Sequence, residues 1–290
     1  MDYFEPKSVA EALSLLARYG ARAKVIAGGT DVMVDIKYKD EPECLINIKR
    51  IGGLRYIEEG NGGLRIGPLV TIRELETNRL VRERLPALWE SCRQFASLQI
   101  RNTATLGGNI CRASPSGETL APLLVLEAKV KLAFAEGEKV EPIESLFLGP
   151  GKTSLGFNGL LTEIDVPYPE RASRSAYLKH AVRGPMDIAM VGVAVLVTPD
   201  ANRSAANDVR IGLGAVAPTP VRARAAEALL RGKPLTAAAV QQAARAAASE
   251  SAPISDQRSS AEYRSWIVEV LTRRGLERTW REATGKEMSG

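Results

Sequence analysis

The stretches Ala27-Gly-Gly-Thr-Asp31 and Thr105-Leu-Gly-Gly-Asn109 each place two glycines beside a hydroxyl group and a second polar side chain. We call them the first and the second glycine turn. Because glycine has no Cβ, the backbone N–H groups of such a turn can come close to a bound anion. Two turns of this kind can grip opposite sides of one diphosphate. A dinucleotide is therefore the first hypothesis for the ligand.

The residues around the first glycine turn predict a strand, a turn and a helix in succession. Lys24-Val-Ile26 has the pattern of a short buried strand, and residues 30–37 fit a helix that begins at Thr30. This order directs N–H groups and the positive end of the helix dipole toward one place. Before the strand, Ser8-Val-Ala-Glu11 forms a capping box for a helix that Gly20 ends.

Further along the chain, strands and helices follow one another. Gly60-Asn-Gly-Gly63 predicts a hairpin between strands at 56–59 and 64–66. Thr71-Ile-Arg-Glu74 is a second capping box, and Pro86 is placed to begin a helix. The other elements predicted in this half are strands at 44–48, 129–134 and 160–166 and helices at 86–95 and 120–126.

The character of the sequence changes after about residue 170. Strands followed by helices indicate a separate α+β domain from here on. The stretch 167–175, rich in Pro, Glu, Arg and Ser, marks the boundary and gives domains at 1–170 and 171–290. The elements predicted in the second domain are an antiparallel meander at 175–180, 188–197 and 209–213 and helices at 222–230, 237–250 and 261–280.

Composition narrows the class of protein. The chain has 290 residues, of which 45% are hydrophobic and 25% charged, as in an ordinary globular protein of two domains. Its net charge of +5 is spread along the sequence, whereas a nucleic-acid-binding protein concentrates basic residues on one face. No apolar run reaches the roughly 18 residues of a membrane span, and the N-terminus lacks a signal-peptide pattern, so a cytoplasmic protein is expected.

Few residues are available for metal binding or covalent catalysis. The three cysteines, Cys44, Cys92 and Cys111, are too scattered for a disulfide framework, a zinc site or an iron–sulfur cluster. His180 is the only histidine, which argues against a histidine metal site or a catalytic triad. Redox chemistry in this chain would therefore come from an organic cofactor, with no metal site and no catalytic residue of its own.

A third glycine stretch looks more like a nucleotide-binding motif, but the residues that follow it argue against nucleotide binding. Gly212-Leu-Gly-Ala-Val-Ala217 matches a loose Rossmann fingerprint after a predicted strand. Pro218 and Pro220 then occupy the positions where a phosphate-binding helix would have to run. We interpret this stretch as a strand that turns sharply into a loop.

The two glycine turns, taken with their flanking residues, resemble a known family. Ala27-Gly-Gly-Thr-Asp-Val-Met-Val-Asp-Ile-Lys37 and Gln99-Ile-Arg-Asn-Thr-Ala-Thr-Leu-Gly-Gly-Asn-Ile-Cys-Arg-Ala-Ser-Pro115 are similar to the FAD-binding (medium) subunits of molybdenum hydroxylases. This family includes carbon monoxide dehydrogenase, nicotinate dehydrogenase and bacterial xanthine dehydrogenase. Val216-Ala-Pro-Thr-Pro-Val-Arg222 resembles its C-terminal domain, so the resemblance covers nearly the whole chain.

The resemblance implies a fold. Residues 1–170 would form an α+β FAD-binding domain of the vanillyl-alcohol oxidase (PCMH) type, with subdomains at about 1–55 and 56–170. A smaller α+β domain of antiparallel strands and helices would follow at 171–290, similar to the C-terminal domain of the carbon monoxide dehydrogenase flavoprotein. FAD would lie between the two subdomains and this C-terminal domain.

The resemblance also implies the residues that bind FAD. The diphosphate would lie between the two turns, and Gly28→Val or Gly108→Val would expel FAD and leave the fold largely intact. Phe95 would contact the adenosine, and Ile110 or Cys111 would border the isoalloxazine. The full implied set is Val25, Ile26, Ala27, Gly28, Gly29, Thr30, Asp31, Val32, Phe95, Thr105, Gly107, Gly108, Asn109, Ile110, Glu118, Leu160 and Lys179.

Several of these residues have a simpler interpretation. Leu160 and Ile110 also suit a plain hydrophobic core, and Lys179 also suits a surface charge at a strand end. Cys111 also suits an inert buried thiol. Glu118 stands where the family often has Asp, which keeps the charge and lengthens the side chain.

The resemblance implies a role in electron transfer. The partners would be a molybdopterin-binding large subunit and a small subunit with two [2Fe-2S] clusters, in a heterotrimer or its dimer. Electrons from a substrate hydroxylated at molybdenum would pass through the clusters to FAD and on to an external acceptor. The chain lacks the cysteines and the insertion of the 4-hydroxybenzoyl-CoA reductase branch. Two alternatives are a stand-alone flavoenzyme, such as the UDP-N-acetylmuramate dehydrogenase type, and a non-enzymatic scaffold that has lost flavin.

Overall fold

The computed structural model describes residues 1–39, 41–60 and 62–288. The chain forms two compact units that interleave along the sequence. Unit 1 consists of Met1–Leu75, Ser97–Ala113 and Glu127–Pro167, and unit 2 consists of Glu76–Ala96, Ser114–Leu126 and Tyr168–Gly290. The division at about residue 170 that the sequence suggests stays a prediction. Among the described residues, no helix is both long and apolar enough to cross a membrane.

Unit 1 begins with a small parallel sheet. Its strands are β1 (Asp2–Phe4), β3 (Cys44–Asn47) and β2 (Ala23–Ile26), in the order β1-β3-β2. Helix α1 (Val9–Tyr19) contributes to the same hydrophobic core, in which Ala12 and Ile46 are fully buried. The predicted N-cap is confirmed, because the Ser8 hydroxyl accepts from the Glu11 N–H at 3.1 Å. Short 3₁₀ turns follow α1 and β3 at Gly20–Arg22 and Ile48–Arg50.

Helix α2 (Val32–Tyr38) begins two residues later than the sequence predicts. The reason is local, because Gly29 has a left-handed φ of +74° and its carbonyl accepts from the Met33 N–H at 3.0 Å. Asp31 occupies the N-cap position, and its side chain makes no capping hydrogen bond. The first glycine turn therefore ends in two non-helical residues, Thr30 and Asp31, before the helix starts.

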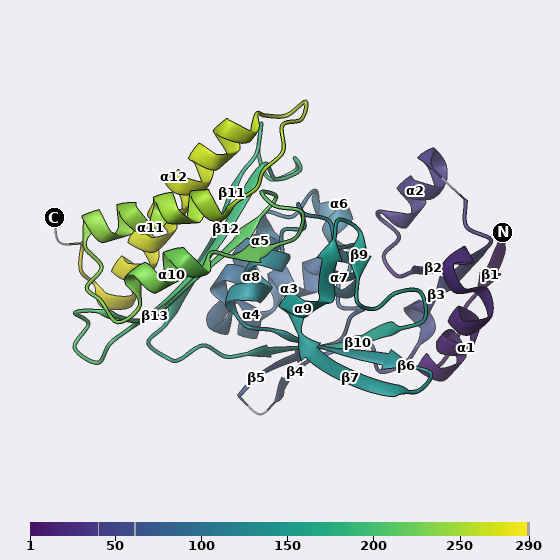
Figure 1. The fold of residues 1–290 in the computed structure, drawn as a ribbon. Helices are drawn as coiled ribbons and strands as arrows, with labels where there is room; N and C mark the ends of the chain where they lie inside the picture. The colour runs from purple at the N-terminus through teal and green to yellow at the C-terminus, as the bar shows by residue number, and fades with distance from the viewer. Residues whose placement is uncertain (40, 61, 289–290) are drawn as a thin grey trace. The chain divides into compact units, whose positions relative to one another are not determined.

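A five-stranded antiparallel sheet forms the rest of the framework of unit 1. Its strands are β4 (Ile57–Gly60), β5 (Gly63–Ile66), β10 (Leu160–Pro167), β6 (Lys129–Phe134) and β7 (Gly137–Pro142), in the order β4-β5-β10-β6-β7. The predicted hairpin is confirmed by the pairing of Gly60 with Gly63, while Asn61 in its turn lies outside the described residues. The β6–β7 hairpin lies at one edge of the sheet (Figure 1).

Short elements complete unit 1. The second capping box is confirmed in both directions, because the Glu74 N–H donates to the Thr71 hydroxyl at 3.2 Å and the Thr71 N–H donates to the Glu74 carboxylate at 2.8 Å. This box starts helix α3 (Ile72–Thr77), which crosses into unit 2. The other elements are α6 (Leu98–Arg101), α7 (Leu106–Arg112), α9 (Ile143–Leu146), β8 (Phe147–Gly149) and β9 (Lys152–Thr153).

Unit 2 is built on the antiparallel meander that the sequence predicts. Its strands β11 (Arg174–His180), β12 (Val191–Pro199), β13 (Ala206–Gly214) and β14 (Val221–Arg222) are neighbours in chain order. Every residue of β12 is buried, because helices cover both faces of the sheet. The helices are α4 (Arg79–Arg84), α5 (Pro86–Arg93), α8 (Leu120–Val125), α10 (Arg224–Leu230), α11 (Ala237–Glu250) and α12 (Ala261–Thr284).

The two faces of this sheet pack against different helices. Helices α10, α11 and α12 lie along one side of this sheet (Figure 1). They share one core with alternate residues of β12 and β13, such as Val195 and Ile211. On the other face, an added Cβ on Gly212 would lie 2.6 Å from the Ala121 carbonyl oxygen of α8. Gly212 therefore serves close packing. No helix follows Gly214, where Ala215 has a φ of +65°, so the dismissal of a Rossmann motif here is confirmed.

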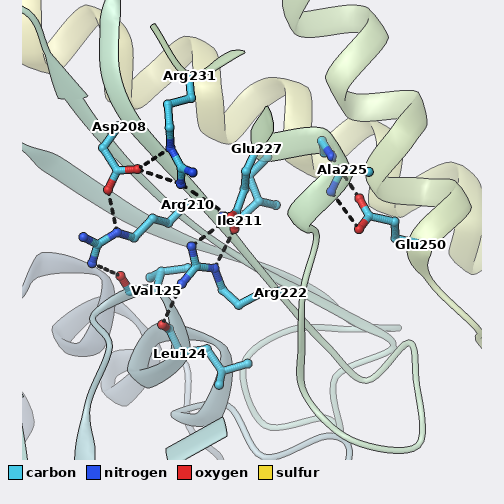
Figure 2. A network of polar contacts seen from close by, with 11 residues as sticks. Leu124, Val125, Asp208, Arg210, Ile211, Arg222, Ala225, Glu227, Arg231 and Glu250 are labelled. Atoms are coloured by element: carbon cyan, nitrogen blue, oxygen red, sulfur yellow. Dashed lines mark hydrogen bonds and ion pairs between the residues drawn. The ribbon is translucent and has the colours of Figure 1, made fainter. Parts of the chain in front are cut away.

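A buried ion pair joins four elements of unit 2. The Arg222 and Glu227 side chains are each only 2% exposed, and the Arg222 Nη2 lies 2.9 Å from the Glu227 Oε2. The Glu227 carboxylate also accepts from the Ile211 N–H at 2.9 Å, and Arg222 donates to the Leu124 carbonyl at 3.4 Å. Figure 2 shows this network, which extends outward to Asp208, Arg210 and Arg231. The pair therefore links β13 and β14 to α10 and α8.

Candidate functional site

The structure brings the two glycine turns together within unit 1. An added Cβ on Gly28 would lie 2.2 Å from the Thr103 carbonyl oxygen and 2.9 Å from the Ala104 Cα. The backbone of the first turn therefore lies directly against the residues that lead into the second. Seventy or more residues of sequence separate these segments. Their juxtaposition is what the two-turn hypothesis requires.

The second glycine turn is fixed by hydrogen bonds to residues 68–70. Leu106 N–H donates to the Val70 carbonyl at 2.9 Å, and Gly107 N–H donates to the Pro68 carbonyl at 3.0 Å. Thr105 is the N-cap of α7, and its hydroxyl accepts from the Gly108 N–H at 3.1 Å. These hydrogen bonds fix the backbone conformation of the second turn.

Protein contacts account for each of the four glycines. An added Cβ on Gly107 would lie 2.5 Å from the Pro68 Cβ, and one on Gly108 would lie 2.9 Å from the Thr105 hydroxyl oxygen. Gly29 needs its positive φ, and Gly28 needs the close approach to Thr103. The glycines therefore shape the turns as well as leaving room for a ligand. This changes the expectation that Gly28→Val leaves the fold intact, because the added side chain meets backbone.

The turns remain accessible to a ligand. Gly108 and Asp31 are exposed, and the other residues from Val25 to Val32 are half-buried. The accessible backbone of the first turn and the Thr30 hydroxyl are donors that suit a diphosphate, whereas the N–H groups of residues 106–109 in the second turn already donate within the protein. The residues of unit 1 therefore fit the phosphate-bearing part of FAD.

Two further residues of the implied set lie in the interior of unit 1. Leu160 at the start of β10 is buried in the core that α1 and β3 form. Ile110 on α7 is fully buried. Both side chains have the core environment of their simpler interpretation, and their contact with FAD stays a prediction. Burial raises the pKa of the neighbouring Cys111 thiol to about 12, which keeps it protonated at neutral pH.

Phe95, Glu118 and Lys179 belong to unit 2. The Lys179 side chain is 2% exposed, and its ammonium donates to Glu118 Oε1 at 2.9 Å and to the Gln94 and Pro185 carbonyls at 3.0 and 2.9 Å. The interpretation of Lys179 as a surface charge is therefore wrong. Its three N–H donors already have protein acceptors, and its contact with FAD stays a prediction. Glu118 therefore has a charged partner within unit 2.

Sequence reasoning missed an ion-pair cluster beside the two turns. Arg112, at the end of α7, donates from Nη1 to Asp35 Oδ2 at 2.5 Å and from Nη2 to Asp35 Oδ1 at 3.3 Å. Its Nε lies 3.5 Å from Asp31 Oδ1. Lys39 also contacts Asp35, at 2.7 Å. The available signal was charge complementarity, since the first turn ends in Asp31 and is followed by Asp35, while Arg112 follows the second turn.

The Asp35 carboxylate of this cluster is stabilised in its charged form. Hydrogen bonds from Lys39 and then from Arg112 hold the pKa of the Asp35 carboxyl below its usual value. Among the described residues, no group of three or more His, Cys, Asp or Glu side chains is arranged to hold a metal ion. The polar chemistry at the turns is therefore that of backbone donors, hydroxyls and this ion-pair cluster.

Comparison with known proteins identifies the class to which this arrangement belongs. Residues 1–169 match the FAD binding domain in molybdopterin dehydrogenase, and residues 176–279 match the CO dehydrogenase flavoprotein C-terminal domain. The chain belongs to the family of FAD-binding subunits that these two domains define. The α+β fold with a C-terminal domain, FAD as the cofactor and the oxidoreductase class are thereby confirmed.

Individual relatives align over almost their full length. The chain is 32% identical to the putative xanthine dehydrogenase FAD-binding subunit of Escherichia coli (strain K12), over 98% of each chain. It is 35% identical to the carbon monoxide dehydrogenase medium chain of Hydrogenophaga pseudoflava, over 96% of each. A structure of carbon monoxide dehydrogenase from that organism, lacking the Mo-pyranopterin moiety of the molybdenum cofactor, superimposes with a TM-score of 0.93 over 97% of each chain.

The N-cap of α7 gives a first test of the site. Thr105→Val removes the hydroxyl that accepts from Gly108 N–H, which should cost about 1 kcal/mol of stability and also weaken FAD binding. Thr236→Val removes an equivalent cap from α11, where the hydroxyl accepts from Ala239 N–H at 3.1 Å, and should cost a similar amount without changing FAD affinity. Urea denaturation and FAD titration of both variants measure the two effects. Equal FAD affinity in both would contradict a role for Thr105 in the site.

Proposed function

We propose that this chain is the FAD-carrying electron-transfer subunit of a molybdenum-containing hydroxylase. In this proposal it takes electrons from [2Fe-2S] clusters on a partner subunit and passes them to an external acceptor. The observation that supports the FAD site most directly is the close approach of Gly28 in the first glycine turn to Thr103 and Ala104, which lead into the second. The family assignment and the names of the relatives, which are FAD-binding subunits and medium chains of dehydrogenases, support the wider role.

Different residues of this chain would bind different parts of FAD. Residues 25–32 would bind the diphosphate through backbone N–H groups and the Thr30 hydroxyl. Residues 105–109 would lie against its other side, with the Thr105 hydroxyl as a further donor. Ile110 and Leu160 would offer apolar surface, and Phe95, Glu118 and Lys179 of unit 2 are proposed contacts as well. Bound FAD supplies the redox chemistry, since a flavin accepts electrons one at a time and releases them singly or as a pair. None of these residues is proposed as a covalent catalyst.

The proposed partners are a molybdopterin-binding large subunit and a small subunit with two [2Fe-2S] clusters, in a heterotrimer or its dimer. Two relatives are named medium chains of carbon monoxide dehydrogenase, and one matching structure is titled as a Cu,Mo enzyme. These names support a complex of several chains around a molybdenum centre. The cytoplasmic location expected from the sequence stays a prediction.

Purification of the tagged full chain from its own cells tests the proposal. We expect two further chains to copurify, with molybdenum and iron by elemental analysis and a [2Fe-2S] signal by electron paramagnetic resonance after reduction. The separated chain should keep the flavin absorption bands at about 370 and about 450 nm. It should contain no metal. A chain that purifies alone with flavin would instead be a stand-alone flavoenzyme. A chain without flavin would be a scaffold, and either result would contradict the proposal.

A further inference from the structure

Helix α2, which directly follows the first glycine turn, is unusually exposed. None of its seven residues is buried, and the apolar side chains of Met33, Val34 and Tyr38 are all exposed. A helix this short is not stable by itself, because nucleation costs more than its few hydrogen bonds return. The apolar side chains of Val32 and Ile36 are only half-buried, so polar contacts must contribute to the position of α2. Any movement of α2 would displace the turn that leads into it.

Arg112 provides such a contact. Its guanidinium forms two hydrogen bonds to the Asp35 carboxylate, of which the shorter is 2.5 Å, and it also faces Asp31 at 3.5 Å. The Asp35 and Arg112 side chains are only 18% and 31% exposed. Bidentate and partly buried pairs hold their geometry better than exposed single contacts. The pair connects the end of α7, which follows the second turn, to α2, which follows the first.

The same cluster balances charge beside the proposed diphosphate site. Asp31 and Asp35 place two carboxylates next to the first glycine turn, and a diphosphate would be repelled by them. Arg112 and Lys39 supply two compensating cations. Loss of Arg112 would therefore release α2 and at the same time leave a net negative charge at the turn.

We propose that Arg112 is a positioning residue for the cofactor, because it ties α2 to α7 through Asp35 and so holds the two glycine turns in the arrangement that binds FAD. This inference rests on the FAD site of the proposed function. It adds a residue outside both turns on which the affinity for FAD depends. The tie, by which we mean the Arg112–Asp35 pair between α7 and α2, lies within unit 1 and forms without the cofactor. It can therefore be measured in the FAD-free chain.

Two variants separate positioning from charge balance. Arg112→Gln loses both the tie and the positive charge, so it weakens FAD binding under either explanation. Asp35→Asn loses the tie but removes a negative charge, so positioning predicts weaker FAD binding and charge balance alone predicts tighter binding. Arg112→Lys keeps the charge without the bidentate geometry and should fall between wild type and Arg112→Gln. Arg79→Gln, which breaks the exposed Arg79–Glu83 pair of unit 2, is the matched control.

The experiment uses the full chain freed of FAD. Hydrogen exchange of the α2 amides should become at least about tenfold faster in Arg112→Gln and Asp35→Asn, with the melting temperature nearly unchanged. FAD titration followed by flavin fluorescence should give a dissociation constant raised at least about tenfold in both, equivalent to about 1.4 kcal/mol. Unchanged α2 exchange, or tighter FAD binding by Asp35→Asn, would overturn the inference. If the wild-type chain fails to bind FAD, the proposed function fails, and the exchange measurement still decides whether the tie exists.

Discussion

Gly28→Val is expected to abolish FAD binding and to destabilise unit 1 at the same time. The first atom of the new side chain would lie 2.2 Å from the Thr103 carbonyl oxygen, and backbone cannot move aside as a flexible side chain can. Overpacking that shifts the backbone typically costs about 1–3 kcal/mol, and we expect the upper end of this range here. The two glycine turns would separate, so both the fold around them and the binding site would be lost.

The control for this prediction is Gly52→Val in the same unit. An added Cβ on Gly52 has no heavy atom within 4 Å, so we expect wild-type stability and wild-type FAD content. FAD per chain from absorbance and urea denaturation of the FAD-free chain measure both properties. A Gly28→Val chain with full FAD content and wild-type stability would show that the turns do not need to touch.

Gly108→Val should behave differently from Gly28→Val. Gly108 is exposed, and its added Cβ would meet only the Thr105 hydroxyl oxygen, at 2.9 Å. Rotation of this hydroxyl gives up the N-cap of α7, which should cost about 1 kcal/mol, so the fold should persist while the added side chain covers the surface of the turn. The sequence-based expectation of FAD loss with an intact fold therefore holds better for Gly108. The comparison of the two variants separates the binding role of the glycines from their packing role.

Glu227→Gln is expected to destabilise unit 2 by about 3–5 kcal/mol, because it removes the negative charge that the buried Arg222 guanidinium contacts on α10. The carboxylate also accepts from the Ile211 N–H, so the substitution weakens the join between β13 and α10 (Figure 2). Urea denaturation of the full chain measures the loss. A cost below about 1 kcal/mol would mean that the pair is not buried as described.

Two further variants define the origin of that loss. Arg222→Met combined with Glu227→Gln removes the buried charge altogether and should recover part of the stability, since an apolar side chain of similar size tolerates burial. Glu83→Gln breaks the exposed Arg79–Glu83 pair and should leave the denaturation midpoint unchanged. A double variant less stable than Glu227→Gln alone would argue that Arg222 acts through its contact with Leu124 instead.

Local features of this fold could be predicted from the sequence because their causes are local. The Ser8 and Thr71 caps, the hairpin at Gly60–Gly63 and the antiparallel meander of unit 2 each depend on a few neighbouring residues or on simple alternation. The order of strands was not predictable in this way. β10 lies between β5 and β6, and its pairing with β5 joins segments about a hundred residues apart.

The candidate site likewise combines features that the sequence shows with features that arise only on folding. The glycines and hydroxyls of the two turns are visible in the sequence, and with them the family and the cofactor. The contact of Gly28 with Thr103 and the tie between Arg112 and Asp35 arise only when distant segments fold together. The burial of Lys179 is another such case, since a lysine near a strand end has no local signal that it will contact Glu118. Long-range packing decided what these residues do.

The most direct test of the account is an equilibrium titration of the FAD-depleted full chain with FAD, followed by flavin fluorescence. Binding at the two glycine turns predicts saturation at one FAD per chain, unchanged in Gly52→Val and absent in Gly28→Val. Saturable binding by Gly28→Val with wild-type affinity, or no saturable binding by the wild-type chain, would contradict it.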